Sequence, residues 1–304
     1  MKIAITTTSF AKFDNQPLQL LKNSGFDVVL NPYGRKLTGD ETVELAAEAV
    51  GLIAGTESLD KSVLGKLPLL KVISRCGVGM DNVDLETAEI LNIKVVNTPL
   101  GPTMAVAELT VGLILDLLRK TTLMNREMRA GIWKKRMGNH LNGKRVGIIG
   151  FGRIGQKAGE LLRAFGCVIG YYDSVRVEGL KDSKAKRMEL DELLRKSDII
   201  TIHVSGKYDK PLLGTKELEM MKKGTWLVNV ARGGVVDEQA LLYALKNGRL
   251  AGAALDVFEK EPYNGPFKEL DNVILTPHIG SYAKEARVEM EMQAARNLIE
   301  GLRR

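Results

Sequence analysis

The chain has 304 residues, 44% of them hydrophobic and 27% charged, which suits two globular domains and excludes a disordered or fibrous protein. The formal net charge of +7 comes from scattered lysines and arginines, and aromatic residues make up only 5%. This pattern indicates a solvated basic surface and a small anionic substrate, and it argues against nucleic acid as a partner. Residues 1–8 lack an export signal and no stretch reaches the ~20 apolar residues of a membrane span, so we expect a cytoplasmic protein without a membrane partner.

The first third of the chain alternates short β-branched runs with amphipathic ones, which is typical of βα units around a parallel sheet. Strands are expected at residues 2–6, 28–30, 51–54, 71–74 and 94–97. Helices are expected at residues 17–23, 40–49 and 84–91. Two prolines and a glycine then punctuate residues 97–102, and we place a domain boundary after residue 98.

A long helix should follow at residues 102–120, with Pro102 in its first turn. Its apolar face is broad and holds Val106, Leu109, Leu113, Ile114, Leu117 and Leu118. Such a helix is either deeply buried or faces another subunit, so we expect a homodimer.

A second βα series fills most of the remaining chain. Strands are expected at residues 144–149, 167–171, 198–203, 225–230, 252–257 and 273–275. Asp237 caps a helix over residues 238–246, and Asn247-Gly248 ends it. A final helix at residues 282–304 crosses back to the first domain. The expected fold class is therefore α/β, with two doubly wound parallel-sheet domains.

The motif Gly150-Phe151-Gly152-Arg153-Ile154-Gly155 follows a buried strand and precedes a helix at residues 156–165. Gly150 allows a tight turn, Gly152 lets a pyrophosphate approach the backbone, and Gly155 lets the helix pack on the strand. The helix N-terminus offers amides and partial positive charge to phosphates. This context predicts a dinucleotide site.

Asp173 stands eighteen residues after Gly155, at the end of the next strand. A carboxylate there accepts hydrogen bonds from the adenosine ribose hydroxyls and repels a 2′-phosphate, so the expected cofactor is NAD. Arg176 lies close by in the sequence and softens that preference.

Three charged side chains follow three successive strands of the second series: Arg232, Glu261 and His278. Hydride transfer to a 2-oxo acid needs a cation for the carboxylate and an acid of near-neutral pKa for the proton. Arg232 fits the first need and His278 the second, and Glu261 can bond the imidazole and raise its pKa. The three histidines of the chain lack metal-site spacing, so no metal is expected.

These motifs resemble the D-isomer-specific 2-hydroxyacid dehydrogenases, and most closely their D-3-phosphoglycerate dehydrogenase branch. The resemblance extends over almost the whole chain, through Gly77-Val78-Gly79-Met80-Asp81-Asn82-Val83-Asp84, Asn97-Thr98-Pro99, Ala107-Glu108-Leu109-Thr110, Leu141-Asn142-Gly143-Lys144, the glycine turn and the strand-end motifs. It implies a Rossmann NAD-binding domain, residues 99–281, inserted in a flavodoxin-like substrate domain, residues 1–98 and 282–304. It also implies a cleft between the domains that closes on cofactor and substrate, and a dimer through the long helix.

The resemblance implies roles for individual residues. Arg232, Glu261 and His278 become the catalytic residues. Substrate contacts are expected at Arg75, Cys76, Gly77, Val78 and Gly79. Cofactor contacts are expected at Val78, Gly150, Gly152, Arg153, Ile154, Gly155, Asp173, Val204, Val230, Ala231, Arg232, Asp256, His278 and Gly280.

The expected reaction is NAD-linked oxidation of D-3-phosphoglycerate, as in serine biosynthesis, with glyoxylate or hydroxypyruvate reduction as the alternative. An NAD(H)-sensing co-regulator is the alternative from another class. A formate dehydrogenase is less favoured, because those relatives generally carry glutamine at the position of Glu261. The run His203-Val204-Ser205-Gly206-Lys207 departs from the family and puts the adenine wall in doubt. Lys134-Lys135-Arg136 is interpreted as solvated surface, and no C-terminal regulatory domain is expected.

Overall fold

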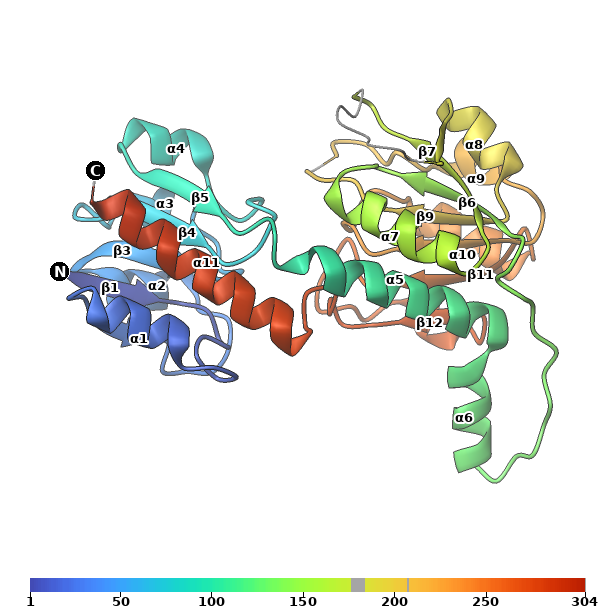
Figure 1. Cartoon of the computed structure of the whole chain (residues 1–304), viewed down its shortest axis with the longest axis horizontal. Coiled ribbons are helices and arrows are strands. Elements are labelled where there is room, and N and C mark those ends of the chain that lie inside the picture. The colour runs from blue at the N-terminus through green and yellow to red at the C-terminus, as the bar shows by residue number, and fades with distance from the viewer. Residues whose placement is uncertain (176–183, 207, 304) are drawn as a thin grey trace. The chain divides into compact units, whose positions relative to one another are not determined.

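The computed structural model describes residues 1–175, 184–206 and 208–303. The chain divides into two compact units, the first made of Met1–Pro102 and Ser281–Arg304 and the second of Thr103–Gly280. Both are parallel α/β layers, as the sequence predicts (Figure 1). In the described part of the chain no helix has the length and apolar character needed to cross a membrane.

The first unit contains a five-stranded parallel sheet of order β2-β1-β3-β4-β5. Its strands are β1 (Lys2–Ile5), β2 (Asp27–Leu30), β3 (Ala49–Ala54), β4 (Val72–Arg75) and β5 (Lys94–Asn97). Its helices are α1 (Gln16–Asn23), α2 (Gly39–Ala46), α3 (Lys61–Leu64), α4 (Leu85–Ile90) and α11 (Lys284–Leu302). One core cluster packs α1 and α11 on one face of the sheet, and another packs α2, α3 and α4 on the opposite face.

The second unit contains a seven-stranded parallel sheet of order β12-β11-β10-β9-β6-β7-β8. Its strands are β6 (Arg145–Ile149), β7 (Val168–Tyr172), β8 (Lys186–Arg187), β9 (Ile199–Ile202), β10 (Thr225–Asn229), β11 (Leu250–Leu255) and β12 (Val273–Leu275). Its helices are α5 (Pro102–Arg119), which begins at the last residue of the first unit, α6 (Thr121–Arg129), α7 (Arg153–Ala164), α8 (Leu190–Lys196), α9 (Thr215–Met220) and α10 (Glu238–Lys246), with a 3₁₀ turn at Pro266–Glu269. The strand order reverses between β6 and β9, which is where doubly wound sheets bind dinucleotides.

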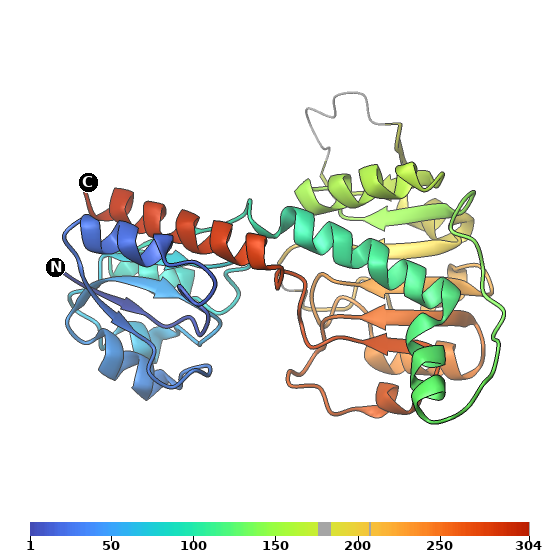
Figure 2. The same cartoon turned by 60° about the horizontal axis from the view of Figure 1, so that its bottom comes forward.

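Opposite faces of this second sheet are covered by different helices (Figure 2). Residues of α5 and α7 pack with Ile148 and Val228 on one face, while α8, α9 and α10 pack with Ile200 and Leu227 on the other. Strands buried on both faces are nearly all apolar, as parallel strands must be. The position of the carboxyl ends of these strands is thus fixed by the two core clusters that cover the faces of the sheet.

Several element boundaries differ from the sequence prediction. The helix expected at residues 40–49 ends at Ala46, because Ala49 already pairs with Lys2 in the sheet. The strand expected at residues 252–257 is β11, which begins at Leu250 and ends at Leu255. The helix expected at residues 156–165 begins at Arg153, immediately after the glycine turn. Tertiary pairing, which local propensity does not encode, decides these ends.

The first unit extends past the boundary expected after residue 98. A Cβ atom on Gly101 would lie 2.6 Å from the Met290 side chain and 3.0 Å from the Ala286 carbonyl oxygen, so the backbone at Gly101 lies directly against α11. Only a glycine allows this close approach. The contacts therefore divide the chain at Pro102 and Gly280.

Candidate active site

The glycine turn has the local geometry that its sequence demands. Gly150 has a φ of +86°, and a Cβ atom there would lie 2.7 Å from the His203 carbonyl carbon at the end of β9. A Cβ atom on Gly155 would overlap the Gly150 carbonyl oxygen. Each of these two positions therefore requires glycine, one for the turn and the other for the packing of α7 on the turn.

Gly152 lies in a different environment. It is the N-cap residue of α7 and provides no side-chain cap, and a Cβ atom there would meet nothing within 4 Å. Arg153 and Ile154 follow at the start of the helix, whose first amides point out of its N-terminus. An open cradle in front of a helix N-terminus fits the pyrophosphate of NAD.

Asp173 lies at the end of β7, beside this turn. Its Oδ2 accepts a hydrogen bond from the Phe151 amide at 2.7 Å, and its Oδ1 accepts one from the Val175 amide at 3.1 Å. The carboxylate is thus fixed against the glycine turn, where a ribose that follows the pyrophosphate would lie. Arg176, which the sequence suggested as a modifier of this site, lies outside the described residues, as does Lys207.

His203 follows β9 at the same edge of the sheet. Its Nε2 lies 3.0 Å from the Thr201 hydroxyl, and burial lowers the pKa of the imidazole to about 3. The ring is therefore neutral, and it is a structural part of the sheet edge. Val204, the expected adenine contact, is the next residue and is half-buried.

His278 and Glu261 form an ion pair or hydrogen bond of 2.9 Å between Nδ1 and Oε2. The imidazole is 50% exposed and the carboxylate 37% exposed, so both are accessible. Burial raises the pKa of Glu261, but the hydrogen bond and charge of His278 outweigh burial and lower it. The Phe258 amide and Arg232 add to the lowering.

Arg232 comes from the loop after β10. Asn229 fixes this loop, because its side chain accepts from the Ala231 amide at 3.1 Å and donates to the Arg232 carbonyl oxygen at 3.0 Å. A Cβ atom on Gly233 would overlap the Phe258 backbone, so the loop packs directly on the segment that leads to Glu261. The neighbouring residues Val230 and Ala231 are buried.

Asp256, at the end of β11, holds the loop that carries His278. The fully buried carboxylate accepts from the Thr276 hydroxyl at 2.6 Å, the Ile279 amide at 2.8 Å and the Gly280 amide at 2.8 Å. Burial raises the pKa of Asp256, and these donors oppose the increase only in part. His278 itself has a φ of +54°, a left-handed conformation that non-glycine residues rarely adopt.

The sequence interpretation missed this network. It placed Asp256 and Gly280 at the nicotinamide end of the cofactor, and it did not include Thr276. The available signal was an aspartate that directly follows a buried strand, with a threonine after the neighbouring strand. The geometry gives Asp256 and Thr276 a supporting role, because their hydrogen bond helps to hold the loop around His278 in a strained conformation.

The loop expected to bind substrate belongs to the first unit. Gly77 has a φ of +154°, its amide donates to the Thr98 hydroxyl at 2.7 Å, and Asn97 donates to the Val78 carbonyl oxygen at 2.7 Å. Arg75 donates to the Cys76 carbonyl oxygen at 2.6 Å, and Gly79 is half-buried. Asn97 and Thr98 thus hold residues 75–79 in shape.

Cys76 itself is buried, and burial raises the pKa of its thiol to about 11. Any contribution that it makes to substrate binding therefore comes from its backbone.

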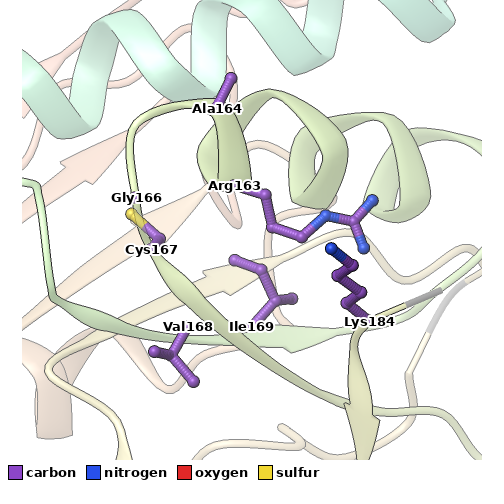
Figure 3. Close-up of a pocket in the computed structure, with 7 residues that line it drawn as sticks. All are labelled: Arg163, Ala164, Gly166, Cys167, Val168, Ile169 and Lys184. Carbon is purple, nitrogen blue, oxygen red and sulfur yellow. The ribbon is translucent and has the colours of Figure 1, made fainter.

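The pocket drawn in Figure 3 lies at the opposite end of β7 from Asp173. Its volume is about 610 Å³, and it is lined by Arg163, Ala164, Gly166, Cys167, Val168, Ile169 and Lys184. These residues surround the beginning of β7, whereas Asp173 follows its end. None of the predicted site residues lines this pocket, so it is not part of the candidate active site.

The second unit has the strand order of a Rossmann fold, and its strand ends carry the glycine turn, the Asp173 carboxylate and the His278–Glu261 pair. These features together define the class of NAD-linked dehydrogenases. Residues 111–280 match the family described as D-isomer specific 2-hydroxyacid dehydrogenase, NAD binding domain. The chain belongs to this family, and NAD is its cofactor.

Individual members of the family indicate which reactions its similar enzymes catalyse. The chain is 43% identical over 256 residues to the glyoxylate reductase of Thermococcus litoralis, which covers 80% of this chain and 77% of that enzyme. It is 40% identical over 254 residues to the D-3-phosphoglycerate dehydrogenase of Archaeoglobus fulgidus, covering 82% of this chain and 48% of that enzyme. The crystal structure of the TT0316 protein from Thermus thermophilus superposes with a TM-score of 0.91 at 35% identity, covering 100% of this chain and 97% of that one. Glyoxylate reductases and D-3-phosphoglycerate dehydrogenases are thus both among the relatives, and the phosphoglycerate branch expected from the sequence is not confirmed.

Proposed function

We propose that the chain transfers a hydride between NAD(H) and a small D-2-hydroxy or 2-oxo acid, with His278 as acid/base, Glu261 as its partner and Arg232 as substrate anchor. The observation that carries this proposal is the 2.9 Å contact between His278 Nδ1 and Glu261 Oε2 at the strand ends of the cofactor unit. NAD(H) supplies or accepts the hydride when bound. The protein supplies the proton, the orientation of the acid and the electrostatics.

His278 is suited to exchange a proton with a substrate oxygen. Its Nδ1 is engaged by Glu261, which leaves Nε2 to donate a proton during reduction or to accept one during oxidation. Glu261 stays ionised at neutral pH because its pKa is lowered, so a carboxylate faces the imidazole and orients it. The pair therefore follows the usual arrangement of a general acid/base with an orienting carboxylate.

Arg232 is suited to hold the carboxylate of the acid. A guanidinium presents two parallel N–H groups to a carboxylate and fixes its plane. Its loop is held by Asn229 and packs on the segment that leads to Glu261. Anchoring by Arg232 would align the 2-oxygen with the proton donor and leave the 2-carbon free to exchange the hydride with NAD(H).

Glyoxylate or hydroxypyruvate is the substrate that we favour. The support is the glyoxylate reductase of Thermococcus litoralis, which shares more of its own length with this chain than the phosphoglycerate enzyme does. D-3-phosphoglycerate is the second candidate substrate, and its oxidation would be a step of serine biosynthesis. It is supported by Arg75, a cation in the loop from which the family draws substrate contacts.

A substrate panel tests the choice. NADH absorbance should fall faster with glyoxylate and hydroxypyruvate than with 3-phosphohydroxypyruvate at equal concentrations. A higher kcat/KM for the phosphorylated acid, together with loss of that advantage in Arg75→Gln, would reverse our preference. Absence of turnover with every 2-oxo acid would reject the dehydrogenase assignment of the three side chains.

We also propose that the chain forms a homodimer in the cytoplasm. Most of the apolar side chains of α5, the helix expected to form the interface, pack in the core of their own unit, so the segment around α6 is the better candidate. Helix α6 has no buried residue, and Trp133 and Met137 in the segment after it are 79% and 89% exposed. Large apolar side chains that are this exposed and close together in the sequence are candidates for burial in an interface. A second copy of the chain is the expected partner at this surface. Light scattering after gel filtration should give twice the chain mass, with a shift toward monomer in Trp133→Ser.

The expected cytoplasmic location is supported by the two free, buried thiols, which suit a reducing compartment.

A further inference from the structure

The adenosine-ribose end of the cofactor site contains a cation that the sequence analysis did not single out. Strand β8 lies at the edge of the second sheet and pairs in parallel with β7. In this register Arg187 lies beside Tyr171, two residues before Asp173. The edge strand therefore brings Arg187 to the carboxylate that should meet the ribose, although fourteen residues separate the two in sequence.

A hydrogen bond fixes this placement. Arg187 Nη2 donates to the Asp173 carbonyl oxygen at 3.2 Å. Within residues 1–175, 184–206 and 208–303, Arg187 makes no ion pair with a carboxylate, and it is exposed. Its charge is thus available to a ligand that approaches the end of β7 from solvent.

The Asp173 carboxylate is held in place by backbone amides. Both of its oxygens already accept backbone hydrogen bonds, from the Phe151 amide on one side and the Val175 amide on the other. These donors fix the side chain against the glycine turn and offset part of its negative charge. Repulsion of an incoming phosphate is correspondingly weaker than from an unsupported carboxylate.

We propose that Arg187 is the residue that binds the 2′-phosphate of NADP, so that the site accepts NADP in addition to NAD. A 2′-phosphate carries close to two negative charges and three acceptor oxygens, and a guanidinium binds it with two N–H groups. Asp173 favours the free ribose hydroxyls of NAD, and Arg187 offsets this preference from the neighbouring strand. Cofactor choice in this chain is set by the balance between these two side chains.

Lys186 provides a matched control. It has the same charge, is also exposed and precedes Arg187 on the same strand, but successive residues of a strand point to opposite faces of the sheet. Arg187→Gln and Lys186→Gln therefore remove the same charge from the same strand. Only the first variant removes it from the side of Asp173.

The test is a fluorescence titration of the whole chain with NADH and with NADPH, which needs no substrate and so does not depend on the acid that the enzyme reduces. We expect the wild-type chain to bind both, NADH more tightly. Arg187→Gln should weaken NADPH binding about tenfold, the effect of losing a charge-assisted hydrogen bond, while NADH binding changes by less than about twofold. Lys186→Gln should leave both dissociation constants within about twofold of wild type.

Asp173→Asn gives a second, opposite readout. Removing its charge should strengthen NADPH binding and weaken NADH binding, and the gain for NADPH should disappear when Arg187→Gln is added. The proposal is overturned if the wild-type chain shows no NADPH binding up to about 1 mM. It is also overturned if Arg187→Gln leaves NADPH binding unchanged, or if Lys186→Gln weakens it equally.

Discussion

Replacing Asp256 by asparagine tests how the fold holds His278, the proposed acid/base. The aspartate accepts three hydrogen bonds, from Thr276, Ile279 and Gly280, and all three donors belong to the loop around His278. Asparagine can keep the two bonds made to one oxygen, but its NH₂ group would then face the Gly280 amide, so two donors would oppose each other.

The magnitude follows from these bonds. Loss of one charge-assisted bond and an unsatisfied buried donor would each cost about 1–3 kcal/mol, while removing a fully buried charge recovers part of this. We therefore expect Asp256→Asn to lower the free energy of unfolding by about 2 kcal/mol, and Tm by about 4–8 °C. Because His278 has a positive φ that only this loop imposes, its imidazole should also shift, and a displacement of about 1 Å can cost up to 10²-fold in kcat.

Denaturant unfolding and NADH absorbance measure the two effects. Asp271→Asn is the control, because Asp271 lies just before β12 but is exposed and pairs with Arg126 at the surface. This exposed pair should contribute about 0–1 kcal/mol. Equal stability and turnover in Asp256→Asn and wild type would refute the view that the carboxylate network positions His278.

The remaining predictions concern the pair and the turn. His278→Ala should lower kcat by about 10²-fold or more with a much smaller effect on NADH binding, and a variant with near-normal turnover would exclude His278 as the acid/base. Glu261→Gln tests the lowered pKa of this carboxylate. The ionised carboxylate stabilises the fold above its unfolded pKa of about 4.5, and this contribution is lost as the pH falls. The difference in unfolding free energy between wild type and Glu261→Gln should therefore become smaller in acid, which denaturation at several pH values would measure. Gly152→Ala should fold normally but bind NADH more weakly, because the added methyl group would project into the space proposed for the cofactor. Gly155→Ala should instead lower the free energy of unfolding by about 1–3 kcal/mol, because its methyl group would overlap the Gly150 carbonyl oxygen. Calorimetry measures the stability and NADH titration the affinity, and identical behaviour of the two variants would contradict this assignment.

The amino-acid sequence alone was sufficient for the local features. Apolar periodicity predicted most of the helices and every strand of the two sheets except the short edge strand β8. The strand at residues 94–97 and the helix at residues 238–246 agree with β5 and α10 at both ends. The glycine pattern predicted the turn, because φ at Gly150 and packing at Gly155 are properties of single residues. The family was recognisable from motifs that are contiguous in the chain.

Tertiary structure decided what depends on residues far apart in sequence. Asp256 reaches Thr276 and Gly280 only because β11 and β12 pair in one register, and Arg187 reaches Asp173 only because β8 pairs with β7. No periodicity within a segment encodes such pairing, since it is fixed by the packing of two sheet faces against different helices. The sequence therefore singled out the side chains proposed to react, and the sheet determined which residues hold them.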